Sequence, residues 1–138
     1  MPREDDCSQS PSGALLQALG EFNRGDWYDC HETLEDLWIG TEFEPRWFYQ
    51  GLLQLAVALL HWRNGNYGGA VTLLTSGCDY LQRVRPVCQR IEVATIVTEA
   101  DRFKAELVRL GPARMAEIPP ELLPKMRLAP IPEPDPAE

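Results

Sequence analysis

The chain has 138 residues, 44% of them hydrophobic, so it can bury one core of ordinary size and has no room for a second domain. Its net charge of -8 and its lack of clustered lysine and arginine argue against nucleic acid and anionic membrane surfaces as partners. No apolar run approaches the roughly 20 residues of a membrane-spanning helix, and the polar, acidic N-terminus does not resemble a secretory signal. We therefore expect a cytoplasmic protein.

Apolar residues recur at spacings of three and four along most of the chain, which predicts an all-α fold. Gly25 and Gly65 are each followed by Asp or Asn and then by an aromatic residue, a pattern that ends one helix and begins the next. Pro45 fits the first position of a helix, and Pro86 stops one. Together these signals predict five helices, over residues 13–23, 27–39, 45–63, 67–84 and 91–110.

The two helix-ending turns also resemble each other. Gly65 follows Gly25 by 40 residues, and in each turn a small residue lies three positions after the aromatic one. This pattern is similar to a helical-hairpin repeat of the tetratricopeptide kind, although a solenoid normally needs at least three repeats. We therefore expect a compact bundle of about five helices that is built from repeat-like antiparallel hairpins.

The composition changes after residue 111, because eight of the twelve prolines lie between Pro112 and Pro136. Such a segment cannot form a long helix. Its leucines and isoleucines are too apolar for a solvated tail, so we expect residues 118–131 to lie over the bundle or over a neighbouring subunit. The predicted organisation is a flexible acidic arm at 1–12, a helical bundle at 13–111 and an extended Pro-rich tail at 112–138 that packs partly on the bundle.

Four cysteines, Cys7, Cys30, Cys78 and Cys88, are too irregularly spaced for a CxxC zinc site and too few for a disulfide scaffold. We expect all four to be reduced, with Cys30 and Cys78 as small core residues. The alternative of Cys30 as a nucleophile next to His31 is disfavoured, because adjacent helical residues point about 100° apart.

The sequence CHETLEDLW places polar residues on the apolar side of the second predicted helix. At about 100° per residue, His31 shares a face with Trp27, Leu34 and Trp38, and Glu35 lies at the edge of that face. A buried imidazole or carboxylate costs on the order of 2 to 7 kcal/mol unless it is paired. The inward position of this pair therefore needs an explanation.

The third predicted helix carries a matching polar stripe, formed by Gln50, Gln54 and His61. If the second and third helices form an antiparallel hairpin, Gln50 faces Glu35 and Gln54 faces His31. His61 then lies roughly 10 Å further along the helix axis, so the hairpin alone does not bring it to His31.

Three interpretations of this cluster remain open. The first is a hydrogen-bond network in which every polar group has a partner. The second is a metal site with His31 and Glu35 as ligands and with His61 or a further carboxylate as the third ligand. The third is a general acid–base pair in a pocket. Glu32 is a weaker ligand candidate because it points away from the apolar face. The sequence HETLE lacks the second histidine of the zinc-protease HExxH motif, so protease chemistry is not inferred.

Three stretches, HETLEDLW, YQGLLQLAVALLHWRNGN and GGAVTLL, together resemble a prokaryotic family known as domain of unknown function 309. The resemblance spans about residues 22–81. It implies a small helical domain whose HxxxExxW motif has been suggested to bind metal, and it implies no biochemical activity. The motif positions are His31, Glu35, Trp38, Gln50, Gly51, Gln54, Ala56, His61, Gly65 and Asn66.

We therefore expect a small cytoplasmic helical protein with a semi-buried polar site that binds a divalent metal ion or a small ligand. The expected metal ligands are His31, Glu35 and His61, and the expected further contacts to a bound group are Gln50, Gln54 and Trp38. The alternative is a protein-interaction or homo-oligomerisation module in which this cluster is structural. The sequence names no reaction and leaves open whether the protein is an enzyme.

Overall fold

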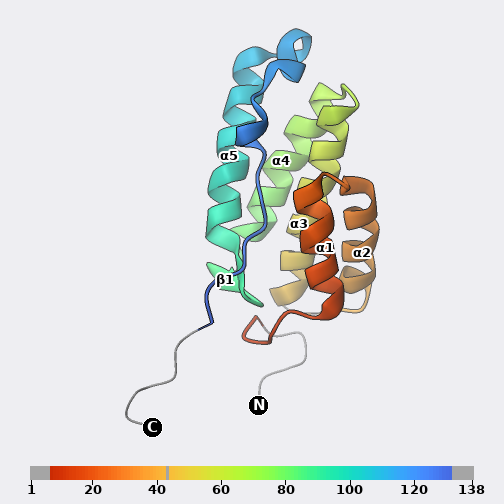
Figure 1. Ribbon diagram of the computed structural model, residues 1–138, viewed down its shortest axis with the longest axis vertical. Coiled ribbons are helices and arrows are strands. Elements are labelled where there is room, and N and C mark those ends of the chain that lie inside the picture. The colour runs from red at the N-terminus through yellow and green to blue at the C-terminus, as the bar shows by residue number, and fades with distance from the viewer. Residues whose placement is uncertain (1–6, 43, 132–138) are drawn as a thin grey trace.

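The computed structural model describes residues 7–42 and 44–131 and shows five packed α-helices, which confirms the predicted all-α fold (Figure 1). Residues 1–6 of the predicted arm and 132–138 of the predicted tail lie outside this part of the chain. None of the described helices is long and apolar enough to cross a membrane. The helices are α1 (Gly13–Arg24), α2 (Trp27–Ile39), α3 (Glu44–Arg63), α4 (Tyr67–Leu81) and α5 (Val93–Leu110).

Three kinds of shorter element surround α5. A hairpin of two short antiparallel strands, β1 (Val87–Cys88) and β2 (Ile91–Glu92), lies between α4 and α5. Two 3-10 turns follow α5, namely η1 (Pro112–Glu117) and η2 (Pro120–Leu122). An extended segment then runs back along the bundle. The strands were not predicted, because a two-residue strand leaves no alternating pattern in the sequence.

The turns after α1 and α3 have the same design, as the sequence predicted. Gly25 and Gly65 both adopt left-handed backbone conformations, with φ of 84° and 80°, which glycine reaches without a steric penalty. The Asn66 side chain then accepts a hydrogen bond of 2.9 Å from the backbone N–H of Gly69 and so caps the start of α4. Asp26 occupies the same position before α2, but its carboxylate binds Arg24 instead of capping the helix.

Replacing Asn66 by alanine should therefore lower the free energy of unfolding by about 1 kcal/mol, the usual loss when an N-cap is removed. Urea denaturation followed by circular dichroism measures this loss. The matched control is Asn64→Ala, two residues earlier in the exposed turn, where we expect a change within about 0.5 kcal/mol. Equal stability of the two variants would contradict the capping role.

The central helix of the bundle is α3, which lies between α2 and α4, while α1 packs on α2 and α5 packs on α4 (Figure 1). At the far end of α3, the Trp62 ring makes edge-to-face contacts with Trp27 at 6.4 Å and Phe103 at 5.3 Å between ring centroids. These ring contacts connect α2, α3 and α5 within one core. The largest fully buried side chains of α3 are Phe48, Leu52, Leu55 and Leu59.

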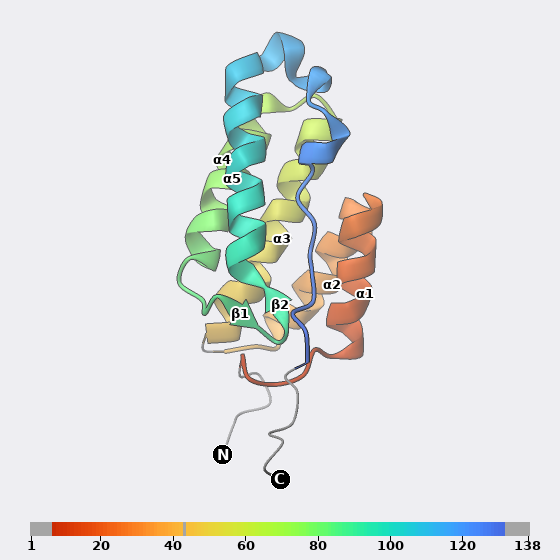
Figure 2. The ribbon, with the colours of Figure 1, turned by 60° about the vertical axis from the view of Figure 1, so that its left-hand side comes forward.

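The C-terminal segment runs in extended form between α5 and α1, as both ribbon views show (Figure 2). Met126 is buried there, and its backbone N–H and C=O both bond to the side chain of Asn23 on α1, at 2.8 and 2.9 Å. The Lys125 backbone N–H donates to Glu99 on α5 at 3.0 Å. The segment therefore covers the seam between α1 and α5 and connects the two helices.

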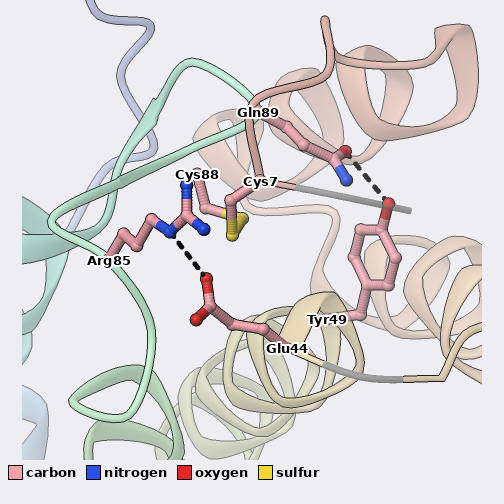
Figure 3. Close-up of a disulfide and its surroundings, with 6 residues drawn as sticks. All are labelled: Cys7, Glu44, Tyr49, Arg85, Cys88 and Gln89. Atoms are coloured by element: carbon pink, nitrogen blue, oxygen red, sulfur yellow. Dashed lines mark hydrogen bonds and ion pairs between the residues drawn. A yellow bond between two sulfur atoms is a disulfide. The ribbon is translucent and has the colours of Figure 1, made fainter. Parts of the chain in front are cut away.

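Cys7 and Cys88 form a disulfide, so the prediction that all four cysteines are reduced was wrong (Figure 3). The N-terminal arm passes beside the β1–β2 hairpin, where the backbone N–H of Gln89 donates to the C=O of Cys7 at 2.7 Å. Cysteine spacing gave no sign of this pairing, because it depends on two segments that meet only after the helices have packed.

Other side chains hold the same end of the bundle together. The Tyr49 hydroxyl on α3 donates to the buried side chain of Gln89 at 3.0 Å, and Arg85 pairs with Glu44 of α3 at 3.3 Å (Figure 3). The two residues that connect the strands, Gln89 and Arg90, have φ of 49° and 64°. Two-residue hairpins require such values, and residues other than Gly, Asn or Asp adopt them at a cost of about 1 to 3 kcal/mol each.

Candidate functional site

The predicted pair on α2 is formed, because His31 and Glu35 lie on adjacent turns of one helix. The His31 Nε2 and Glu35 Oε2 atoms are 3.1 Å apart, and their side chains are 28% and 46% exposed. The ring of Tyr28, one turn earlier, lies 5.8 Å from the imidazole between centroids. The pair is thus within reach of solvent, where an ion pair alone adds little stability and both groups are accessible to a ligand.

Beside this pair, a pocket of about 160 Å³ lies between α2 and α3 and is open to solvent. Glu35 and Trp38 line it from α2, and Gln50 and Leu53 line it from α3. The antiparallel hairpin had placed Gln50 opposite Glu35, and both residues do line the same pocket. Leu53 was not among the predicted site residues; it lies one turn after Gln50, a spacing that puts both side chains on one face of α3.

Trp38 forms one wall of the pocket and carries an unusual polar atom. The indole Nε1–H is buried and has no hydrogen-bond partner in the part of the chain that the structure describes. The guanidinium of Arg46 lies over the indole ring, 4.4 Å from its centroid. A buried donor without a partner costs about 1 to 3 kcal/mol, so a group that accepted this hydrogen bond would recover that cost.

The other two predicted site residues lie elsewhere. Gln54 accepts a hydrogen bond from Ser76, so it faces α4 and not His31. The His61 Nδ1 atom lies 3.3 Å from the Asn66 side-chain amide, in the turn between α3 and α4. Within residues 7–42 and 44–131, no group of three or more His, Cys, Asp or Glu side chains is arranged to hold a metal ion. The structure therefore brings together His31 and Glu35 and leaves His61 apart from them.

The two free cysteines are buried core residues, as expected. Burial raises the pKa of the Cys30 thiol, with a smaller contribution from Glu21, and the Sγ atom lies 3.4 Å from the C=O of Ala18. Burial, together with Asp101, also raises the pKa of Cys78 to about 12. Both thiols remain protonated at neutral pH, and a protonated thiol is a poor nucleophile. Neither residue suits covalent catalysis.

Comparison with known proteins gave two matches. The sequence model of a family described as Domain of unknown function (DUF309) matches residues 15–73, a range that contains all six predicted site residues. A protein of Bacillus subtilis (strain 168) described as "Uncharacterized protein YpuF" is 38% identical over 71 residues. This alignment covers 50% of the present chain and 41% of the relative, so the chain spans less than half of that protein.

No solved structure matches the chain. The resemblance deduced from the HxxxExxW motif is confirmed by the family match, which includes the whole of α2 and α3 and the first half of α4. Residues 15–73 of the chain are therefore similar to the family described as Domain of unknown function (DUF309).

Proposed function

We propose that the pocket between α2 and α3 binds a small organic cation, such as an amine or a guanidine. The observation that carries this proposal is the position of the Glu35 carboxylate, which lines a pocket with one aromatic and one apolar wall. A carboxylate at a pocket recognises a cationic group by a charged hydrogen bond, and this bond carries the proposal because the guanidinium of Arg46 already lies over the Trp38 ring.

Neighbouring side chains support the same ligand chemistry. His31 holds Glu35 from one side through the 3.1 Å contact, and Gln50 adds an amide that can donate or accept. The unpaired N–H of Trp38 favours a ligand that also carries an acceptor, such as a hydroxyl or carbonyl oxygen. The net charge of -8 would raise the local concentration of any cation.

A ligand screen by saturation-transfer NMR tests the proposal. The probes are propylammonium, ethanolammonium and guanidinium, and 1-propanol serves as a neutral probe of similar size. We expect the cations to bind and propanol not to bind. Glu35→Gln should weaken binding about 10- to 100-fold, the equivalent of a lost charged hydrogen bond of about 1.5 to 3 kcal/mol. Glu32→Gln, an exposed carboxylate on the same helix, is the matched control and should leave binding unchanged.

Two results would contradict the proposal. One is equal binding of propanol and propylammonium, because the carboxylate would then contribute nothing to recognition. The other is an equal loss of affinity in Glu35→Gln and Glu32→Gln, which would indicate a general effect of net charge rather than a site at the pocket.

A divalent metal ion is the second candidate, and the spacing of His31 and Glu35 favours it. An imidazole nitrogen and a carboxylate oxygen on adjacent helical turns can bind one ion together, with water in the remaining positions. Two protein ligands make a weak site by themselves. Titration calorimetry with Zn²⁺ and Mn²⁺ tests this candidate: His31→Ala should abolish the heat of binding, and His61→Ala should not. If His31→Ala binds metal like the unmodified chain, the metal candidate fails.

A further inference from the structure

The guanidinium of Arg46 lies against one wall of the pocket between α2 and α3 and has no acidic partner there. Its central carbon is 4.4 Å from the centroid of the Trp38 ring, and Trp38 lines the pocket. In the part of the chain that the structure describes, this guanidinium forms no ion pair and donates no hydrogen bond. Arg63 makes a similar contact with the Trp27 ring, at 4.7 Å, but it donates a hydrogen bond of 2.7 Å to the C=O of Gly25. The N–H groups of Arg46 are therefore available to a ligand.

The same pocket also carries a negative charge, on Glu35. This carboxylate contacts His31 at 3.1 Å and does not pair with Arg46. Arg46 precedes Gln50 by one helical turn, so it lies roughly 6 Å along α3 from the residue that lines the pocket with Glu35, at 1.5 Å per residue. Two opposite charges thus lie at separate positions along one hairpin. A ligand with a single charged group would be attracted by one of them and repelled by the other.

The indole N–H of Trp38 adds a second donor beside Arg46. It is buried and has no hydrogen-bond partner among the described residues. The indole and the guanidinium that lies over it both donate hydrogen bonds, and neither can accept one. A carboxylate has two oxygens and can accept from both donors at the same time. These two side chains therefore suit the carboxylate of a ligand.

We propose that the ligand of this pocket is an amino-acid zwitterion, whose ammonium group binds Glu35 and whose carboxylate binds Arg46 and the Trp38 N–H. The inference rests on the proposed binding of an amine, and it names the second charged group that the amine carries. The separation of roughly 6 Å along the helix axis favours a ligand in which a few methylene groups lie between the two charges, such as γ-aminobutanoate. The pocket volume of about 160 Å³, that of roughly five water molecules in the liquid, accommodates a small amino acid of this kind.

Three probes of matched shape separate this inference from the proposed function. Propylammonium is γ-aminobutanoate without its carboxylate, and butanoate is the same molecule without its ammonium group. Titration calorimetry of the full chain should give an affinity for γ-aminobutanoate at least about tenfold higher than for propylammonium, because a second charged hydrogen bond forms. Butanoate should also bind more weakly than γ-aminobutanoate. Equal affinities for γ-aminobutanoate and propylammonium overturn the inference and leave the proposed function standing, whereas binding of neither probe contradicts both.

Arg46→Met tests the role of the guanidinium, because methionine keeps an unbranched apolar side chain over Trp38. This variant should bind γ-aminobutanoate no more tightly than propylammonium, while its affinity for propylammonium stays the same or rises. Retained binding of propylammonium shows that the variant is folded. Arg102→Met is the matched control, since Arg102 is an exposed residue of α5 and its loss changes the net charge equally. The control should change neither affinity. A chain with Arg46→Met that still prefers γ-aminobutanoate overturns the inference.

The NMR signal of the Trp38 indole N–H gives a readout that a general change of net charge would not move. This signal, assigned with a Trp38→Phe variant, should shift downfield when γ-aminobutanoate is added, because the N–H gains an acceptor. Propylammonium should shift it less. The indole N–H groups of Trp27 and Trp62 already donate to the backbone C=O groups of Phe22 and Met115, at 3.1 and 2.8 Å, so their signals should stay in place. A Trp38 signal that does not move at saturating γ-aminobutanoate overturns the placement of the carboxylate.

Discussion

Reduction of the Cys7–Cys88 disulfide is expected to lower the free energy of unfolding by about 4.5 kcal/mol. The bond joins residues that are 81 positions apart, and a loop of that length removes a large conformational entropy from the unfolded chain. Chemical denaturation with and without a phosphine reductant measures the difference. The loss is a large fraction of the roughly 5 to 15 kcal/mol that stabilises a domain of this kind, so the reduced chain should melt at a clearly lower temperature.

The matched control is the double variant Cys7→Ala/Cys88→Ala. It should be destabilised like the reduced protein, and the reductant should not change it further. Alkylation in denaturant followed by mass spectrometry identifies the thiols involved: without reductant only Cys30 and Cys78 should react, and after reduction Cys7 and Cys88 should react as well. If the reductant leaves the stability of the unmodified chain unchanged, the disulfide does not contribute in the way its loop length implies.

The disulfide also bears on the compartment predicted from the sequence. Glutathione and thioredoxin keep thiols reduced in most cytoplasmic environments. A cytoplasmic chain would therefore hold Cys7 and Cys88 as thiols, with the arm at residues 7–12 held by the remaining contacts, such as the bond from Gln89 to the Cys7 carbonyl. Trapping free thiols in intact cells before lysis would measure which form the protein adopts there.

The helices could be predicted because their start and stop signals are local. The glycines at 25 and 65 act through their own backbone conformation, and the residue after each one begins the next helix whatever the rest of the chain does. The composition of residues 118–131 predicted that they lie over the bundle or a neighbouring subunit, and Met126 is buried on the bundle, but local signals identified neither the α1–α5 seam nor the disulfide. Both join residues that are far apart in the sequence, by 81 positions in the disulfide and by 103 in the Met126–Asn23 bonds, and this spacing alone does not predict that they come together.

The candidate site was predicted in part, and the geometry of α3 explains the limit. Helical periodicity placed Gln50 and Gln54 on one stripe, but α3 lies between two neighbouring helices. Gln50 lines the pocket shared with α2, whereas Gln54 bonds to Ser76 on α4. Periodicity gives the direction of a side chain only to within a few tens of degrees. On α3 a difference of that size decides whether a glutamine faces α2 or α4. His61 lies seven residues after Gln54, in the last turn of α3, where its ring contacts the side chain of Asn66.

The close packing of α3 on α4 depends on two glycines that face each other, and it sets the position of both helices around the site. A Cβ atom added at Gly51 would lie 2.6 and 2.7 Å from side-chain carbons of Leu81 and 3.0 Å from the Gly77 carbonyl oxygen. Leu81 is almost fully buried, so it has little space into which to move. This contact gives Gly51, one of the motif positions, a structural reason to be glycine.

Gly51→Ala is therefore expected to lower the free energy of unfolding by about 2 kcal/mol, although alanine is the better helix former by about 1 kcal/mol. Urea denaturation measures the effect. Gly68→Ala on α4 is the matched control: its added Cβ meets nothing within 4 Å, so its free energy of unfolding should stay the same or rise, by up to about 1 kcal/mol. A Gly51→Ala chain as stable as the control would mean that α3 and α4 can separate without cost. A destabilised Gly51→Ala chain would instead show that the position of α3 depends on having no side chain at this helix crossing. The placement of Gln50 opposite Glu35 would then depend on Gly51 as well.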